Sequence, residues 1–317
     1  MSRLFMCCLC VAVLLSAILC GCSRTEIPAV DVMETESTVR ADTVPTEEIA
    51  AETTEPVVSS IPEETEQTET EPEAVYVPWY ATSRLIYHAG GEVKGFSYTN
   101  SMEAIKQTLE QGNRLLEIDF LFTSDGHLVC LHEWKNLQGL SRPCTLEKFL
   151  SLQMYYQFTP ITAEDVIVFM REYTDMYLII DTKEPDALSV VGELLRLCDY
   201  APEIASRFVI QLYDSGIKAR CMDLYAFSDD NFLFTAYKFG PNRVSDILNL
   251  CMEENIRIVT VPYGSWDKAT VQRFTDAGCL VFEHTVNYTS MTDNGLSRGI
   301  YGFYTDSLQE TDLNIPE

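Results

Sequence analysis

Eight short apolar runs, each the length of one β-strand, recur along the chain from about residue 85 to residue 305. Amphipathic stretches with helical periodicity separate most of them, so predicted strands and helices alternate. Alternation of this kind predicts an α/β protein in which eight parallel strands close into a (β/α)8 TIM barrel, here spanning residues 76–317. The predicted strands are Leu85–His88, Leu115–Phe122, Tyr177–Thr182, Arg207–Tyr213, Phe232–Tyr237, Arg257–Pro262, Leu280–Val286 and Gly302–Thr305.

An open, doubly wound sheet would show a similar alternation. Its dinucleotide-binding form needs a glycine-rich loop after the first strand, and the segment HAGG at residues 88–91 is too short for that fingerprint. The first helix is expected to begin with a capping box of Asn100 and Glu103 and to end near Gly112. The predicted helices are Ser101–Gln111, Ala163–Tyr173, Leu188–Cys198, Val244–Glu254 and Lys268–Ala277.

The N-terminus reads as a targeting segment. Arg3 precedes the apolar run Leu4–Leu19, and the sequence LCGC ending at Cys22 follows. This pattern resembles a bacterial lipobox, which implies a lipoprotein signal peptide at residues 1–21, cleavage before Cys22 and lipidation of its thiol. The alternative is an uncleaved membrane anchor, since the run is just long enough to span a bilayer. Either interpretation predicts an extracytoplasmic protein held at the cell membrane.

Residues 22–75 have the composition of a disordered linker. Fifteen acidic residues face two basic ones between Ser23 and Val75, and aromatic residues are almost lacking. Such a segment buries too little apolar surface to offset its ordering entropy, so we expect a flexible stalk. The whole chain has a formal net charge of −26, which argues against nucleic-acid partners.

The eleven cysteines do not form a zinc pattern. Five of them lie in the leader, and the remaining six are scattered without a CxxC spacing. An exported protein permits a disulfide, but the spacing favours no particular pairing.

Acidic side chains interrupt two of the apolar strands. Glu117 and Asp119 are two apart and therefore share one face, and Asp181 ends the next predicted barrel strand. Like charges buried side by side are costly unless something neutralises them. Because functional residues of a barrel gather at the C-terminal ends of its strands, these three carboxylates predict a hard-cation site for Ca²⁺ or Mg²⁺. An exposed face of an antiparallel sheet is the alternative, but both faces here are strongly apolar.

Two histidines end neighbouring strand segments. His88 closes the first strand, and His132 follows the strand that returns after the turn Ser124-Asp125-Gly126. Histidine moves protons near neutral pH, and Lys183 adds a fixed positive charge. Together with a divalent cation these groups would suit phosphodiester cleavage. Each histidine taken alone would more often be a satisfied core residue, and the role of His284 stays open.

In order along the chain these residues resemble the glycerophosphodiester phosphodiesterase family, within the phosphatidylinositol-phospholipase-C-like barrels. The resemblance covers most of residues 84–306. Its motifs match His88 and Gly90, Asn100-Ser101, Glu117-Ile118-Asp119, the turn Thr123–Gly126, His132, Asp181-Thr182-Lys183 and Thr305-Asp306.

The resemblance implies hydrolysis of a glycerophosphodiester to glycerol phosphate and an alcohol. It assigns metal binding to Glu117, Asp119 and Asp181. It assigns acid–base work to His88 and His132, and phosphate contact to Lys183.

Three positions depart from the family pattern. Ala89 replaces an arginine that in the family helps to hold the phosphate, Thr99 replaces a glutamate, and Asp181 is one methylene shorter than the family's glutamate. Lys238 or a backbone N–H of Gly90 or Gly91 is a candidate to replace the missing cation.

The sequence therefore predicts a metal-dependent phosphoric diester hydrolase acting on lipid-derived or cell-wall glycerophosphodiesters. One alternative is a lyase-type phospholipase that releases a cyclic phosphate. Another is a non-catalytic barrel that binds a phosphate polymer at the surface, for which the missing arginine is the only support.

Overall fold

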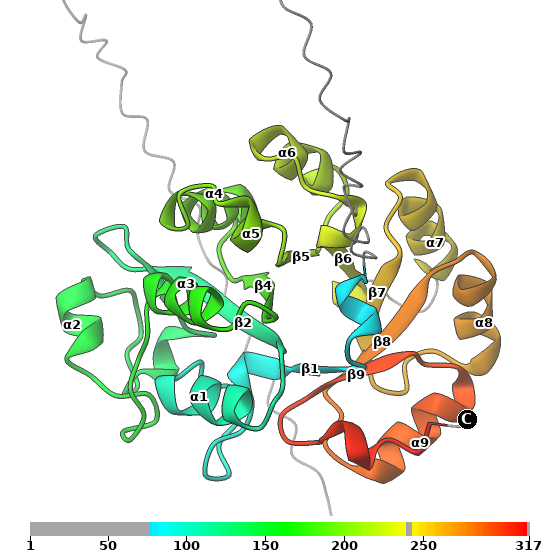
Figure 1. The fold of residues 1–317 in the computed structure, drawn as a ribbon, viewed down its shortest axis with the longest axis horizontal. Helices are drawn as coiled ribbons and strands as arrows, with labels where there is room; N and C mark the ends of the chain where they lie inside the picture. The colour runs from blue at the N-terminus through cyan, green and yellow to red at the C-terminus, as the bar shows by residue number, and fades with distance from the viewer. Residues whose placement is uncertain (1–76, 239–242, 316–317) are drawn as a thin grey trace, which may run out of the picture. The chain divides into compact units, whose positions relative to one another are not determined.

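The fold of this protein is a closed barrel of eight parallel strands ringed by helices (Figure 1). The computed structural model describes residues 77–238 and 243–315. Strands neighbour one another in the order β1-β9-β8-β7-β6-β5-β4-β2, and pairing of β1 with β2 closes the ring. The barrel strands are β1 (Leu85–Tyr87), β2 (Leu115–Phe122), β4 (Tyr177–Thr182), β5 (Phe208–Leu212), β6 (Phe232–Thr235), β7 (Ile258–Pro262), β8 (Leu280–His284) and β9 (Gly302–Thr305). The predicted TIM barrel and all eight predicted strands are confirmed.

A ninth strand, β3 (Leu128–Cys130), pairs antiparallel with the end of β2. Gly126 in the connecting turn has a φ of +84°, a conformation that a glycine adopts without strain. The Thr123 hydroxyl accepts a hydrogen bond from the His127 N–H and stabilises the same turn. The predicted hairpin therefore forms, and it returns the chain toward the carboxyl ends of the barrel strands.

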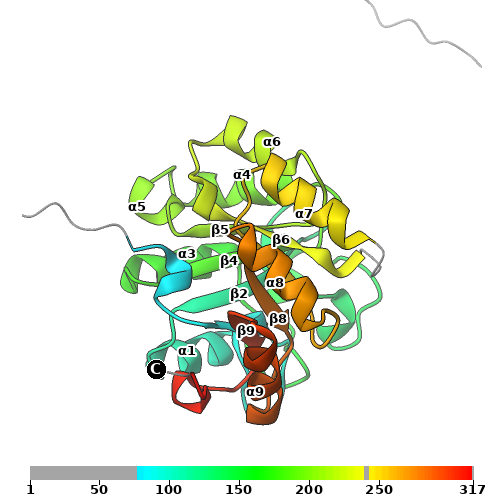
Figure 2. The same ribbon diagram turned by 90° about the vertical axis from the view of Figure 1, so that its right-hand side faces the viewer.

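The helices cover the outside of the barrel, and Figure 2 shows α8 and α9 on the side formed by β8 and β9. All five predicted helices are present, with ends within one residue of the prediction. Helix α6, with eight residues, and helix α9, with ten, were not predicted. Helix α6 is weakly amphipathic, and α9 contains Gly295 and five Ser, Thr or Asn residues. The helices are α1 (Met102–Glu110), α2 (Leu146–Leu150), α3 (Ala163–Glu172), α4 (Ala187–Leu197), α5 (Pro202–Ala205), α6 (Ile217–Leu224), α7 (Val244–Glu253), α8 (Lys268–Asp276) and α9 (Thr289–Arg298).

One predicted cap is wrong. The N-cap of α1 is Ser101, whose hydroxyl accepts a hydrogen bond from the Ala104 N–H. Asn100 has a left-handed backbone with φ +44° and turns its side chain away from the helix toward Asp119. Glu103 accepts hydrogen bonds from Thr159 instead of closing a capping box. The Asn100 amide donates to the buried Asp119 carboxylate and therefore does not cap the helix.

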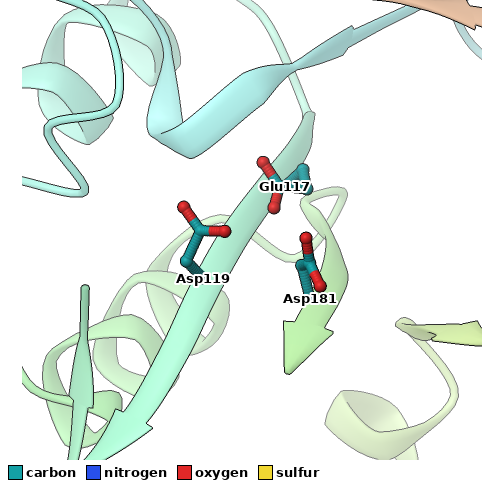
Figure 3. Close-up of side chains that lie close together, drawn as sticks. All are labelled: Glu117, Asp119 and Asp181. Atoms are coloured by element: carbon teal, nitrogen blue, oxygen red, sulfur yellow. The ribbon is translucent and has the colours of Figure 1, made fainter. Parts of the chain in front are cut away.

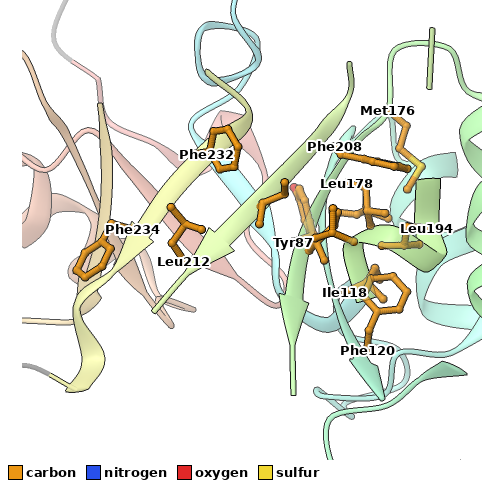
Figure 4. Packing of buried hydrophobic residues seen from close by; sticks show 14 of the residues in the cluster. Tyr87, Ile118, Phe120, Met176, Leu178, Leu194, Phe208, Leu212, Phe232 and Phe234 are labelled. Atoms are coloured by element: carbon orange, nitrogen blue, oxygen red, sulfur yellow. The ribbon is translucent and has the colours of Figure 1, made fainter. Parts of the chain in front are cut away.

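The outward faces of the strands form the main core with the helices. Ile118 and Phe120 alternate with Glu117 and Asp119 along β2, as the pleat of a strand requires. Figure 4 shows these two side chains with others from β4, β5, β6 and α4.

The inward faces change character along the barrel axis. Leu115 on β2 and Ile179 on β4 are apolar, whereas Glu117 and Asp181, each two residues further along its strand, carry charge. Trp79 closes the apolar end, and its indole N–H donates to the Asp230 carbonyl at 2.8 Å. We call this apolar layer the barrel floor: Trp79, Ile86, Leu115, Ile179, Val209, Leu233, Ile258, Phe282 and Tyr304.

The predicted signal peptide, the lipidation at Cys22 and the acidic linker lie outside the described residues. None of the helices within 77–238 and 243–315 has both the length and the apolar character needed to cross a bilayer. The six cysteines after the leader are present as free thiols.

Candidate active site

Three carboxylates meet at the carboxyl ends of β2 and β4, which we call the barrel mouth (Figure 3). Asp119 lies directly across from Asp181 in the parallel pairing of the two strands, and Glu117 shares the inward face of β2. One oxygen of each carboxylate lies within 4.8 Å of the others. The three residues are at most 5% exposed, so the predicted cluster exists and is buried.

The loop between β1 and α1 holds the two carboxylates of β2. The Ala89 N–H donates to Glu117 Oε2 at 2.7 Å. The Asn100 amide donates to Asp119 Oδ2 at 2.8 Å and accepts the Asp119 N–H at 3.0 Å. These bonds require a left-handed backbone at both Ala89 and Asn100, an uncommon conformation for residues with a side chain.

A chain of hydroxyl and amide groups holds the third carboxylate. Tyr213 donates its phenol hydrogen to Asp181 Oδ1 at 2.8 Å, and Gln211 donates to the Tyr213 oxygen at 2.7 Å. Tyr304 in turn donates to Gln211 Oε1 at 3.0 Å. Residues on β5, just after β5 and on β9 thus fix the orientation of Asp181.

Lys183 supplies the nearest positive charge. Its ammonium nitrogen lies 2.5 Å from Asp181 Oδ2 and donates a hydrogen bond there. It also lies 2.8 Å from Asp119 Oδ1, as an ion pair without hydrogen-bond alignment. Burial alone would lower the pKa of Lys183, but the two aspartates raise it, so the ammonium stays charged. Lys183 therefore pairs with two of the three carboxylates.

Glu117 is the carboxylate of the cluster that has no ion pair with Lys183. Its Oε1 is buried and has no hydrogen-bond partner among the described residues. Burial, reinforced by Asp119, raises the pKa of Glu117 to about 8. Burial also raises the pKa of Asp181. At Asp119 burial acts in the same direction, but Lys183, His132 and His88 together outweigh it and lower the pKa. An unpaired oxygen beside two further carboxylates is the donor set that Ca²⁺ or Mg²⁺ binds, so the residues fit a hard divalent cation.

His88 lies at the same mouth and is oriented by a carboxylate. Its Nδ1 is 3.0 Å from Asp306 Oδ1, which leaves Nε2 for other partners. Asn287 holds Asp306 through two hydrogen bonds, one to Oδ2 at 2.6 Å and one from the Asp306 N–H at 2.8 Å. Burial works against a charged imidazole, but the bond to Asp306 and the nearby carboxylates raise the pKa of His88 to about 9.

His132 approaches from the strand pair of β2 and β3. The Leu131 N–H beside it donates to the Asp119 carbonyl at 2.9 Å, which brings the His132 side chain to the mouth. About a third of the side chain is exposed. Burial lowers the pKa of His132, which favours the neutral imidazole. The two histidines are thus in opposite electrostatic environments.

Tyr98 stands between the two histidines. Its ring centroid lies 4.3 Å from that of His88 and 5.1 Å from that of His132, and both contacts are edge-to-face. The sequence contained no signal for this position. In the sequence, Asp306 belongs to a motif without a role of its own, Tyr213 is a candidate for substrate contact or packing, and Asn287 carries no signal.

Three groups were candidates to replace the arginine lost at Ala89, and one of them already has a hydrogen-bond partner. The Gly91 N–H donates to the His88 carbonyl at 2.8 Å, so the candidate role of Gly91 as a phosphate donor is wrong. Gly91 is glycine for another reason: its φ is +94°, and a Cβ there would lie 2.4 Å from the Thr108 hydroxyl. The side chain of Lys238 lies outside what the structure describes.

His284 lies at the mouth end of β8 and stacks on Tyr237, with ring centroids 3.6 Å apart. Its Nε2 is buried and has no hydrogen-bond partner among the described residues. Burial lowers the pKa of His284 to about 3, so this imidazole is neutral. Beside the mouth, Lys183 and Tyr213 also line a cavity of about 370 Å³ between the ends of β4 and β5.

Residues 89–184 match the model of the Glycerophosphoryl diester phosphodiesterase family. This segment contains the acidic cluster, His132 and Lys183, and the match confirms the resemblance expected from the sequence. Among curated proteins, no sequence matches the chain.

Solved structures of phosphodiesterases share the fold of this chain. A glycerophosphodiester phosphodiesterase from Parabacteroides distasonis is 18% identical, with a TM-score of 0.56 over 70% of this chain and 92% of that one. One from Thermotoga maritima is 19% identical, with a TM-score of 0.53 over 70% and 94%. An Oleispira antarctica phosphodiesterase, in complex with its product sn-glycerol-3-phosphate, is 16% identical, with a TM-score of 0.58 over 72% and 95%.

Proposed function

We propose that this protein, whose residues 89–184 carry the glycerophosphoryl diester phosphodiesterase pattern, hydrolyses glycerophosphodiesters to glycerol phosphate and an alcohol. The observation that carries the proposal is the buried cluster of Glu117, Asp119 and Asp181 with one unpaired oxygen, at a mouth shared with two histidines of opposite pKa shift. The product named for the Oleispira antarctica relative supports a substrate of the same class.

Glu117, Asp119 and Asp181 would hold the cation, either Ca²⁺ or Mg²⁺. Such an ion, when bound, supplies charge neutralisation for the phosphate oxygens. Oxygen ligands on two rigid strands suit either ion, and the number of further ligands would decide between them. The Ala89 N–H and the Asn100 amide keep two of the carboxylates aimed inward while the site is loaded.

The two histidines would divide the proton transfers. His88, whose charge Asp306 stabilises, holds a proton at neutral pH and is suited to protonate the leaving alcohol oxygen. His132 is neutral and is suited to accept the proton of the attacking water. Pairs of groups whose pKa values are pushed apart are typical of acid–base assignments.

Lys183 would contact the phosphate oxygens of the substrate. Its ammonium lies 2.8 Å from Asp119 Oδ1 and 2.5 Å from Asp181 Oδ2, and its side chain is partly exposed. Asp119 and Asp181 therefore hold the Lys183 charge beside the carboxylates that would bind the cation.

The deciding experiment uses purified protein with Ca²⁺ or Mg²⁺ and a panel of glycerophosphodiesters, with glycerol phosphate as the measured product. Turnover is expected to stop on addition of a chelator and to fall about 100-fold or more in His88→Asn. His127→Asn is the matched control, because His127 is exposed in the β2–β3 turn. A cyclic phosphate product would favour the lyase, and no turnover on any diester would leave only phosphate binding.

We also propose that the protein is a bacterial lipoprotein anchored through Cys22. The support is the lipobox-like sequence ending at Cys22 and the acidic linker that follows it. A Cys22→Ala variant is expected to lose the lipid mass from its N-terminus and to leave the membrane fraction. Persistence of membrane attachment in that variant would favour an uncleaved anchor.

A further inference from the structure

Tyr98 lies beside His88 and His132, and neither cation binding nor proton transfer accounts for its position. Its ring contacts His88 on one side and His132 on the other, with interplanar angles of 89° and 77°. Edge-to-face contacts at such centroid distances are favourable and directional, so each fixes the orientation of a ring. A single aromatic side chain thus touches both imidazoles of the proposed acid–base pair.

The backbone holds this ring in place from an unusual conformation. Tyr98 has a left-handed φ of +57°, and Asn100 two residues later has +44°. Asn100 is tied to Asp119 by two hydrogen bonds, so the turn that fixes the carboxylate also directs the tyrosine. Thr285, on the loop after β8, interacts with the phenol end of the ring. Strained residues of this kind persist only where the surrounding structure holds them.

The two histidines depend on this ring to different degrees. His88 has a strong second anchor in Asp306, at 3.0 Å. The His132 imidazole makes no hydrogen bond to any residue that the structure describes, and its nearest carboxylate oxygen, on Glu133, is 4.0 Å away. That glutamate is bound by Lys135 at 2.6 Å. Among these interactions, the edge-to-face contact with Tyr98 is the one that bears directly on the orientation of the His132 ring.

We propose that Tyr98 is a positioning residue, which holds the His132 imidazole, and with it the spacing of the His88–His132 pair, in the orientation that proton transfer needs. The proposal rests on the proposed function. The aromatic ring carries the effect, because the contacts to both imidazoles are made by ring atoms. A misplacement of about 1 Å in an acid–base group costs about 100-fold in rate.

The test compares Tyr98→Ala and Tyr98→Leu with Tyr98→Phe in the full-length protein with saturating Mg²⁺ or Ca²⁺. Both ring-deleting variants are expected to lose about 100-fold in kcat with KM changed less than about threefold, since positioning acts on the chemical step. The phenylalanine variant is expected to stay within about threefold of the wild type. Tyr156→Ala is the matched control: Tyr156 also has a left-handed φ, of +63°, and has no ring contact with a histidine among those described.

A second readout needs no turnover. The chain has four histidines, so their imidazole NMR signals can be assigned one by one. Loss of the Tyr98 ring is expected to shift the His88 and His132 signals and to leave that of His127, in the exposed β2–β3 turn, in place. Unshifted His88 and His132 signals would overturn the proposal.

Other outcomes would overturn it too. Wild-type kcat in the two ring-deleting variants would show that the ring positions nothing. A Tyr98→Phe variant as impaired as Tyr98→Ala would transfer the role to the hydroxyl. If the wild type hydrolyses no diester, the proposed function fails by itself, and the NMR comparison still decides whether the ring holds the imidazoles.

Discussion

The two ends of the barrel interior are built on the same strands and serve opposite purposes. On β2, Leu115 belongs to the floor and Glu117 to the mouth; on β4, Ile179 and Asp181 make the same change two residues apart. The floor buries apolar area, which stabilises the fold. The mouth buries carboxylates, which destabilises it until a cation or a hydrogen bond compensates. Two positions along one strand therefore separate a residue that stabilises the fold from a residue of the candidate active site.

The largest expected effect separates the two ends most clearly. Glu117→Gln removes one charge of the acidic cluster and should lower kcat/KM by about a thousandfold, or about 4 kcal/mol. The metal-free protein should keep its stability at pH 7, because burial raises the pKa of Glu117 to about 8 and the wild-type group is then mostly protonated. Kinetics with saturating cation and urea unfolding without it check both halves. Loss of metal-free stability would show that the mouth also supports the fold.

A floor variant should behave in the opposite way. Leu233→Ala removes a fully buried side chain of the floor and is expected to cost about 3 kcal/mol of unfolding free energy. Its kcat/KM per folded molecule should match the wild type, since no floor leucine reaches the acidic cluster. Urea unfolding and active-enzyme kinetics are the measurements, and Leu150→Ala, at a half-exposed leucine, is the control. A large fall in kcat/KM in Leu233→Ala would show that the floor also contributes to catalysis.

Adding the cation should convert the mouth into a stabilising region. At a free concentration of 100 times its Kd, Mg²⁺ or Ca²⁺ should raise the unfolding free energy by about 2.7 kcal/mol. Leu233→Ala should gain as much as the wild type, because its cluster is intact, and Glu117→Gln should gain much less. Thermal unfolding with and without chelator provides the comparison. Equal gains in all three proteins would place the cation elsewhere.

The smallest effect concerns pH. The folded pKa of His284 is depressed to about 3, so its contribution to stability is complete above the unfolded value near 6.5 and is lost as the pH falls toward 3. Between pH 6.5 and 5 the wild type should therefore lose about 1.6 kcal/mol of unfolding free energy relative to His284→Asn. Urea midpoints across that range test this, with His127→Asn as the control. A constant difference would mean that His284 stays neutral in the unfolded chain or charged in the fold.

Most of the acidic cluster could be predicted because its members lie close in the sequence pattern. Glu117 and Asp119 interrupt an apolar strand, and Asp181 ends the next barrel strand, so the strand period alone places them on one face. The hydrogen-bond partners of these carboxylates were harder to predict from the sequence. Asn100 has the composition and position of a helix cap, and only the competing Asp119 carboxylate shows that it is used otherwise. The observed N-cap, Ser101, is one residue later than the predicted one.

The sequence by itself determined the eight-stranded barrel and the three carboxylates at its mouth, because periodicity and strand ends are local properties of a chain. Only the tertiary structure decided how the site is held together. Asp306 reaches His88 from 218 residues away, and Tyr98 lies between two histidines that belong to different elements. Such contacts depend on barrel closure and on left-handed turns, and neither leaves a periodic signal in the sequence.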